Sequence, residues 1–387
     1  MNNKVAIIGS DHINTLGLIR TFGENGIRVY LFLVSDSKIN AVQKSRYVEK
    51  YWICENENAA LEKIVEVLGD EKEKPAIIPS SDPACLCLDA NYSRLKDSFI
   101  MPNIQRKGSM IYRYMDKFLQ QKTVEENGIR GIKSRIISLD SPDGAASLGF
   151  PVILKPNISA EGNKEDIRIC KNAEEYSSAK DELIDLGYKS ILVQELIKYD
   201  FECDVQGFSV NGDTSVPGVI EKIRVYPPKR GSTTFGAAVP CGKYAAVIDG
   251  IKRIMKELEY TGIFDIDIFV SQKEDGTSDF CLNEINFRNS AISYAYGKSY
   301  IAYYWYLSCV ENRFADCPPI EESYTFIDDQ ADLHNVLDGI ITEKQHRRDM
   351  KNAKILLAKN ADDKKPSRTM FVKKVLGKIS HAAKRSH

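Results

Sequence analysis

Acidic and amide side chains gather on one face of two strand-like segments, FDIDIFV (264–270) and FCLNEINFRNS (280–290). Successive residues of a strand point to opposite faces, so Asp265 and Asp267 share one face of the first segment. One face of the second segment reads, in order, Phe280, Leu282, Glu284, Asn286 and Arg288. That strand begins as core and ends with an acid, an amide and a base, a pattern that burial alone does not require.

Pairing of these segments as antiparallel strands would bring two carboxylates and an amide oxygen around one point. Magnesium takes oxygen ligands, typically one or two carboxylates, and completes its shell with water and substrate phosphates. The candidate ligands are Glu284, Asn286 and one of the two aspartates on the facing strand, Asp265 or Asp267. Arg288 would present a fork of donors to a phosphate or carboxylate. The alternative is an exposed hairpin whose polar face is merely solvated.

The N-terminal segments that would support this hairpin alternate between strands and helices. KVAIIGS, a helix through TLGLIRTFGENG, and IRVYLFLV predict a parallel, Rossmann-like start, which a helix at 59–68 and a strand at 75–82 continue. The glycines form no G-x-G-x-x-G motif, so a nicotinamide or flavin cofactor is not expected. The loop Ser80 to Asp82 follows a strand, where α/β sheets present ligands.

The middle of the chain changes to antiparallel patterning. A helical segment ends near Gly128, and the strand PVILKP ends in Lys155 before a polar loop with one glycine. Further along, the segment 201–226 alternates like paired antiparallel strands around the turn Asn211-Gly212. A helix at about 244–259 leads into the acidic hairpin.

Length and composition exclude several classes of protein. The 387 residues predict two or three lobes, and 43% hydrophobic with 28% charged residues is ordinary for a folded protein. No apolar run is long enough to span a membrane and no signal peptide is evident, so we expect a cytoplasmic protein. Nine scattered cysteines suit reduced, buried thiols. Only His12 precedes residue 334 among five histidines, which disfavours histidine-based catalysis.

An ordered set of residues resembles the ATP-grasp superfamily between roughly Tyr114 and Asn289. It comprises Lys117 after Met-Asp, Lys155, the loop 159–164, VQELI at 193–197, Glu202, Asp267 and the run Glu284-x-Asn286-x-Arg288. The resemblance implies an α/β (α+β ATP-grasp) fold: a Rossmann-like domain at 1–113, then a two-lobed ATP-grasp domain at 114–315 with its lid at about 130–197. The overall arrangement is similar to carbamoyl-phosphate-synthase-like proteins and carboxylate–amine ligases.

The resemblance also implies how ATP would be held. Lys117 and Lys155 would bind the α- and β-phosphates, and the loop containing Ser159 and Gly162 would close over them, although family loops usually have more glycine. The adenine edge and the ribose would be bound by Glu195, the backbone of Leu196 and Ile197, and Glu202.

The metal ligands implied by the resemblance belong to the candidate set identified from the two strands, with Asp267 as the aspartate. Asp267, Glu284 and Asn286 would coordinate one or two Mg2+ ions, for which Mn2+ is a possible substitute, and Arg288 would steady the transferred phosphoryl group. The implied enzyme is an ATP-dependent ligase that joins a carboxylate to an amine through an acyl phosphate, on a small metabolite or a cell-surface precursor. The alternatives are a non-catalytic ATP-binding regulatory protein, as synapsins are in this superfamily, and an ATP-grasp phosphotransferase.

The segment 221–239 is the candidate for binding the acid substrate. It places Lys222, Arg224, Lys229 and Arg230 beside Ser232, Thr233 and Thr234, and Asn289 is a further candidate. The alternative is a surface hairpin with a stiff Pro-Pro turn. We expect a small-molecule carboxylate and an amine as partners and no nucleic acid, and the sequence is compatible with a homodimer.

The C-terminal part is predicted as an extension at 316–343 and a basic tail at 344–387. The tail has 14 lysines and arginines against three aspartates. Within it, five apolar residues recur at helical spacing with lysines opposite, at Phe371, Val372, Val375, Leu376 and Ile379. This pattern fits a short amphipathic helix at an anionic membrane surface. Disorder and nucleic-acid binding are the alternatives.

Overall fold

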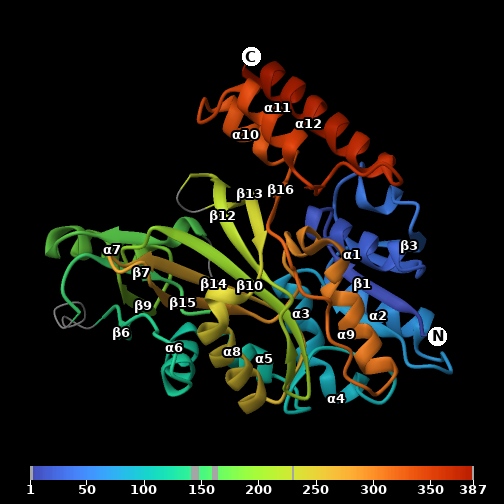
Figure 1. The fold of residues 1–387 in the computed structure, drawn as a ribbon, viewed down its shortest axis with the longest axis horizontal. Coiled ribbons are helices and arrows are strands. Elements are labelled where there is room, and N and C mark those ends of the chain that lie inside the picture. Colours follow the sequence, from blue (N-terminus) through green and yellow to red (C-terminus); the bar gives the residue numbers. More distant parts are fainter. Residues whose placement is uncertain (1–2, 141–147, 159–163, 229–230, 386–387) are drawn as a thin grey trace.

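The computed structural model describes residues 3–140, 148–158, 164–228 and 231–385, with side chains as far as residue 374. Its first sheet is parallel, in the order β3-β2-β1-β4, with α1 on one face and α2 and α3 on the other (Figure 1). The elements are β1 (Val5–Gly9), α1 (Ile13–Glu24), β2 (Val29–Val34), β3 (Val48–Cys54), α2 (Glu57–Leu68), β4 (Ala76–Pro79) and α3 (Asp82–Ala90). The predicted Rossmann-like start is confirmed. The edge strand β3 was not predicted. Its sequence, VEKYWIC, does not alternate between apolar and polar residues, and its apolar residues Tyr51 and Ile53 are exposed.

A large sheet forms the centre of the molecule, in the order β15-β14-β10-β12-β13-β16-β17, with β11 paired to β10 and β5 to β14. Its strands are β5 (Asn103–Ile104), β10 (Phe201–Val210), β11 (Asp213–Ser215), β12 (Val219–Tyr226), β13 (Ser232–Val239), β14 (Tyr260–Gln272), β15 (Ser278–Asn286), β16 (Tyr324–Ile327) and β17 (Ile355–Leu356). The predicted turn joins β10 to β11: Asn211 and Gly212 both have positive φ, at 50° and 87°, as a two-residue hairpin turn requires.

The two faces of this sheet have different environments. One face packs against α8 (Ala245–Glu257), whose Ile251 and Ile254 lie in a core with Val205 and Ile266 of the strands. The other face begins as core, where Phe208 packs with α1 and with α9 (Ile301–Val310). Further along the strands the same face becomes polar, and the candidate site lies there.

A third, smaller sheet, β6-β9-β7-β8, lies at the opposite end of the molecule from the parallel sheet (Figure 1). It consists of β6 (Ser134–Ser138), β7 (Val152–Lys155), β8 (Arg168–Cys170) and β9 (Ser190–Glu195), with α7 (Ala173–Asp185). Leu154 and Val193 of the strands and Leu183 of α7 form a separate core. This lobe falls within the predicted lid and is connected to the central body through α6 (Lys117–Glu126).

The C-terminal region differs from the predicted basic tail. It contains α10 (Asp332–Leu337), α11 (Glu343–Asn352) and α12 (Lys364–Arg385), and β17 joins the central sheet beside β16. Residues 344–363, the first part of the predicted basic tail, fold against the central sheet and bury polar side chains such as His346 and Asp349. No helix in the described part of the chain combines the length and apolar character that crossing a membrane requires.

An ion pair without solvent exposure connects the first helix to this C-terminal region. Arg20 of α1 donates from Nε to Asp363 Oδ2 at 3.1 Å, and the two side chains are 0% and 1% exposed. The guanidinium also donates to the backbone oxygens of Leu357 and Ala358, at 2.8 and 2.9 Å. Asp363 additionally accepts from Ser45 Oγ at 2.8 Å. The end of the central sheet is thus fastened to the parallel sheet through one buried guanidinium.

Replacing Arg20 with methionine is expected to lower the free energy of unfolding by about 3–5 kcal/mol, because the buried Asp363 charge would lose its partner. Urea denaturation followed by circular dichroism would measure this change. Arg28→Met is the matched control, since Arg28 and Glu49 form an exposed pair that contributes about 1 kcal/mol or less. Equal, small effects of the two substitutions would contradict the structural role given to Arg20.

Candidate functional site

The polar face of the hairpin β14–β15 forms as the alternation predicted. Asp267 lies directly opposite Glu284, and Asp265 lies directly opposite Asn286. Side chains at such positions point to the same side with Cβ atoms about 4.5–5.5 Å apart. The register shifts between Asp267 and Ile268, just beyond the acidic pair. Asn286 Nδ2 approaches Asp267 Oδ2 at 3.5 Å, so the amide and the carboxylate face each other.

A third strand contributes residues that the sequence analysis did not select. In β10, Asp204 lies opposite Asp267 and Gln206 opposite Asp265, so the polar face spans three strands. Asp204 is 4% exposed. The sequence signal was present, because Glu202, Asp204 and Gln206 alternate in FECDVQ as the acids do in FDID. Of these three residues only Glu202 was predicted to belong to the site, and the alternation itself was interpreted as paired strands.

Lys222 of β12 lies at the centre of this polar face. Its Nζ is 2.6 Å from Asp267 Oδ1, 2.8 Å from Asp204 Oδ1 and 3.3 Å from Glu202 Oε2. The side chain is only 10% exposed. Lys222 was expected among the substrate-binding basic residues, whereas in the structure its ammonium compensates three carboxylates.

The neighbouring charges separate the protonation of the two aspartates of β14. Burial raises the pKa of Asp265 to about 6, with a further contribution from the Asp267 charge. Burial would also raise the pKa of Asp267, but the Lys222 ammonium and its hydrogen bond outweigh it and lower that pKa to about 2. Burial disfavours the charged form of Lys222, yet the surrounding carboxylates raise its pKa above the ordinary value. Asp267 is thus the more strongly ionised of the two aspartates.

Two lysines approach the acidic pair from the small lobe and from α6. Lys117 begins α6, is buried, and places Nζ 3.5 Å from Glu284 Oε1. Its backbone N–H donates to the oxygen of Asn157, which brings it beside the strand that ends in Lys155. Burial lowers the pKa of the Lys155 ammonium to about 8, partly offset by the charge of Glu284. A cation in such a position is available to bind an anion.

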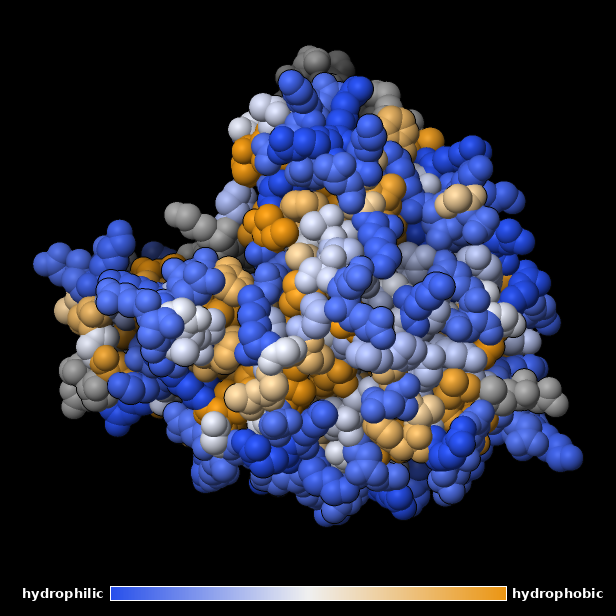
Figure 2. Space-filling view, in the orientation of Figure 1, coloured by the Kyte–Doolittle hydropathy of each residue, from blue (hydrophilic) through white to orange (hydrophobic). Residues whose placement is uncertain are grey.

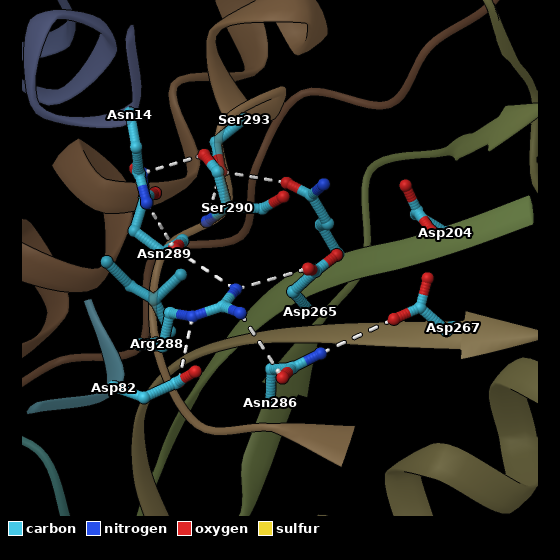
Figure 3. A network of polar contacts seen from close by, with 12 residues as sticks. Asn14, Asp82, Asp204, Asp265, Asp267, Asn286, Arg288, Asn289, Ser290 and Ser293 are labelled. Atoms are coloured by element: carbon cyan, nitrogen blue, oxygen red, sulfur yellow. Dashed lines mark hydrogen bonds and ion pairs between the residues drawn. The ribbon is translucent and has the colours of Figure 1, made fainter. Parts of the chain in front are cut away.

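Arg288 connects the acidic face to the parallel sheet (Figure 3). Its Nε donates to Asp82 Oδ1 at 3.0 Å, and its two Nη atoms lie 3.4 Å from Asp265 Oδ2 and 3.2 Å from Asn286 Oδ1. These carboxylates, Asp82 foremost, raise the pKa of Arg288 further above its ordinary value. The loop that follows β4, expected to present a ligand, therefore reaches the site through Asp82.

Three of the four predicted substrate residues can be placed, and two of them, Asn289 and Thr233, are buried. Asn289 is 1% exposed and its amide donates to Asn14 Oδ1 and to the oxygen of Ser290 (Figure 3). This position corrects the expected contact with substrate, because the amide is already used between α1 and the central sheet. Ser232 is exposed and Thr233 is buried on β13. Arg230 lies outside the described residues.

The predicted nucleotide-binding residues lie where the small lobe meets the central sheet. Glu195 ends β9 and accepts from the Lys133 N–H at 3.1 Å, while the Leu196 N–H donates to Pro151 O at 3.2 Å. Ile197 is buried in a small cluster between the lobes. Glu202 accepts from Tyr199 Oη at 2.7 Å and lies near Lys222. Ser159 and Gly162 lie outside the described residues.

A buried polar cluster holds β12 and β13 from the C-terminal side. Arg224 donates to both oxygens of Asp332 at 2.7 and 2.9 Å and to Asp349 Oδ2 at 3.1 Å. His346 Nδ1 lies 2.7 Å from Asp332 Oδ2, and Thr234 Oγ1 donates to Asp332 Oδ1 at 2.8 Å. Arg224 was expected to help bind substrate. Its guanidinium instead fixes α10 and α11 to the strand that carries Lys222.

The oxygen atoms of this face fit a divalent cation that shares its shell with phosphates. Asp267 and Glu284 supply two carboxylates at facing positions and Asn286 supplies an amide oxygen. Within the described residues, no group of three or more histidine, cysteine, aspartate and glutamate side chains is arranged to hold a metal. The buried Asp265 Oδ1 makes no hydrogen bond within the described part of the chain.

Comparison with known proteins relates the chain to others through its structure. No protein-family model and no curated protein matches the sequence. Among solved structures, an ADP complex of N5-carboxyaminoimidazole ribonucleotide synthetase is similar with a TM-score of 0.63 and 14% identity, over 87% of this chain and 85% of that one. An N5-carboxyaminoimidazole synthetase from Staphylococcus aureus has a TM-score of 0.64 and 13% identity, with 88% of both chains covered. An L-amino acid ligase from Bacillus licheniformis has a TM-score of 0.59 and 14% identity, over 84% and 79%.

Proposed function

This chain has the ATP-grasp fold, and on that premise we propose that it is an ATP- and Mg2+-dependent ligase that joins a carboxylate to an amine. The observation that carries the proposal is the convergence of two lysines, two facing carboxylates and one arginine on a single polar face. Similarity to an ADP complex and to an L-amino acid ligase supports the same chemistry. Positioning and charge compensation dominate phosphoryl transfer, and these charged groups would supply both.

The nucleotide would bind between the small lobe and the central sheet. Lys117 and Lys155 would contact its phosphates as point charges, and the loop with Ser159 and Gly162 would cover them. The adenine edge would meet Glu195 and the backbone of Leu196 and Ile197. Glu202, which follows Ile197 by five residues, would accept hydrogen bonds from the ribose hydroxyls in place of its contact with Lys222.

Asp267, Glu284 and Asn286 would hold Mg2+, and Mn2+ would suit the same oxygen ligands. The facing register of Asp267 and Glu284 favours Asp267 over Asp265, which is turned toward Arg288. When bound, the ion would neutralise charge on the β- and γ-phosphates during transfer.

The reaction would proceed in two steps. A substrate carboxylate oxygen attacks the γ-phosphorus, the bond to the β-phosphate oxygen breaks, and ADP leaves the acyl phosphate behind. An amine then attacks the carbonyl carbon, phosphate leaves with the C–O electron pair, and the amine loses a proton. Arg288 would stabilise the transferred phosphoryl group with donors already oriented by Asp82 and Asp265.

The acid substrate would enter beside the β12–β13 hairpin, where Arg230 and Ser232 are the proposed contacts. Ser232 is exposed at the start of β13, whereas the burial of Thr233 limits it to shaping the hairpin. The Arg224 cluster with α10 and α11 would keep this hairpin in place.

Phosphate release from ATP and Mg2+ in the presence of paired carboxylic acids and amines tests the proposal. We expect release that requires one acid and one amine together and that matches amide formation. Nucleotide binding without turnover on any pair would favour a regulatory ATP-binding protein. Phosphoryl transfer without an amide product would favour a phosphotransferase.

ATP affinity is expected to fall by about tenfold between about pH 7 and about pH 9, because Lys155 loses its proton across that range. A lysine pKa near 8 in the empty site leaves the ammonium about nine-tenths neutral at pH 9, so ATP binding must take up a proton there. Calorimetric titrations in two buffers of different ionisation enthalpy would measure this uptake. Lys155→Met should bind ATP weakly without this pH dependence, and Lys189→Met, at an exposed lysine of the same lobe, should behave as wild type. A constant wild-type affinity would contradict the role given to Lys155.

A further inference from the structure

Helix α12 concentrates positive charge in an otherwise acidic protein. Residues 364–387 contain eight lysines and arginines and no acidic residue, whereas residues 1–363 carry 45 basic and 54 acidic residues. Hydrophilic residues dominate the upper part of the molecule, where α11 and α12 lie (Figure 2). None of the residues proposed to bind ATP, Mg2+ or substrate lies on this helix.

One side of α12 is attached to the body of the protein. Lys373 Nζ lies 2.6 Å from Asp11 Oδ2, and Lys374 Nζ donates to the oxygen of Gln330 at 3.0 Å. Met370 packs against the core that α1 and the parallel sheet share. Residues three and four apart lie on the same face of a helix, so Met370, Lys373 and Lys374 define the face that contacts the body.

A different side of the helix presents apolar residues to solvent. Phe371 is 56% exposed and Val372 is 49% exposed. In the sequence, Val375, Leu376 and Ile379 continue the same helical spacing of apolar residues. The helix is thus attached to the body through Met370 and two lysines, while Phe371 and Val372 remain exposed on a different side.

We propose that α12 binds an anionic membrane surface, with the stripe that begins at Phe371 and Val372 inserted among the lipids. Exposed apolar residues bordered by the exposed cations Lys364, Lys365 and Arg368 match a lipid interface with anionic headgroups. A nucleic acid would attract the cations but would leave the phenylalanine and valine in water. An anionic membrane repels the net acidic body, so α12 is the part that makes contact.

Vesicle co-sedimentation of the full chain tests this proposal. The protein is expected to sediment with vesicles that contain phosphatidylglycerol and to remain largely in solution with phosphatidylcholine alone, with weaker binding at high ionic strength. Phe371→Ser combined with Val372→Ser should weaken binding about tenfold or more, because two exposed apolar side chains would no longer enter the interface. In a separate variant, Phe371→Trp should show a blue shift of its fluorescence on the same vesicles.

The matched control is Tyr51→Ser combined with Ile53→Ser, which removes two similarly exposed apolar side chains from β3. It should sediment as wild type does. The proposal is overturned if wild-type protein does not bind phosphatidylglycerol vesicles, or if the variant at 371 and 372 binds as well as wild type while its circular dichroism is unchanged. It is also overturned if DNA displaces the protein and the tryptophan emission never shifts.

Discussion

Glu284→Gln is expected to lower phosphate release by about 100- to 1,000-fold, comparable to the loss of one preorganised group that stabilises a transition state electrostatically. Glutamine keeps the size of the side chain and its place opposite Asp267 on the β14–β15 hairpin. It removes the negative charge that would hold the divalent cation and that lies 3.5 Å from Lys117 Nζ. The loss should fall mainly on turnover, with ATP still bound in the absence of Mg2+. Coupled phosphate release, together with calorimetry with and without Mg2+, separates these two effects.

Asp279→Asn is the control for this substitution. Asp279 lies on the same strand, and its carboxylate pairs with Arg130 and Lys273 at the exposed end of the hairpin. Removal of that charge should leave turnover within about twofold, since exposed pairs contribute little. If Glu284→Gln kept wild-type turnover, Glu284 would not be a metal ligand and the proposed position of the metal site would be wrong.

The sequence predicted the parallel start and the acidic hairpin well because both depend on local periodicity. The apolar runs before Gly9 and Pro79 and the alternation in FDID each need only a few neighbouring residues to be read. In the structure these segments form the predicted strands β1, β4 and β14. Pairing partners were harder to predict, because the register between β10 and β14 joins residues about 60 positions apart.

The residues whose roles were misjudged are those whose surroundings come from distant segments. Arg224 and Asn289 are polar residues in loop-like or strand-end sequence, and exposure at a substrate site was a reasonable expectation for both. In the structure Arg224 meets Asp332 of α10, and Asn289 meets Asn14 of α1. The attachment of the C-terminal region could not be predicted for the same reason, because Asp363 gains its buried partner, Arg20, from the far end of the chain. Composition cannot show such contacts.

The ammonium of Lys222 and the proposed metal would compete for the same carboxylates. In the structure its ammonium compensates Asp204, Asp267 and Glu202, whereas Mg2+ bound by Asp267 would bring two further positive charges to the same carboxylates. The lysine would then have to release Asp267, and its freed ammonium would be available to a phosphate or a substrate carboxylate. Metal-free stability and metal affinity should therefore respond to a substitution of Lys222 in opposite directions.

Lys222→Met is expected to lower the free energy of unfolding in metal-free buffer by about 3–5 kcal/mol, because it leaves buried carboxylates without their cation. Added Mg2+ and ADP should restore more stability to this variant than to wild type, since the ion would no longer compete with an ammonium. Thermal or urea denaturation with and without MgADP measures both effects. Lys243→Met is the control, because Lys243 pairs with Glu221 at a site where it is half exposed. If Lys222→Met unfolded like wild type without metal, or gained no more than wild type from MgADP, Lys222 would not occupy the position of the cation.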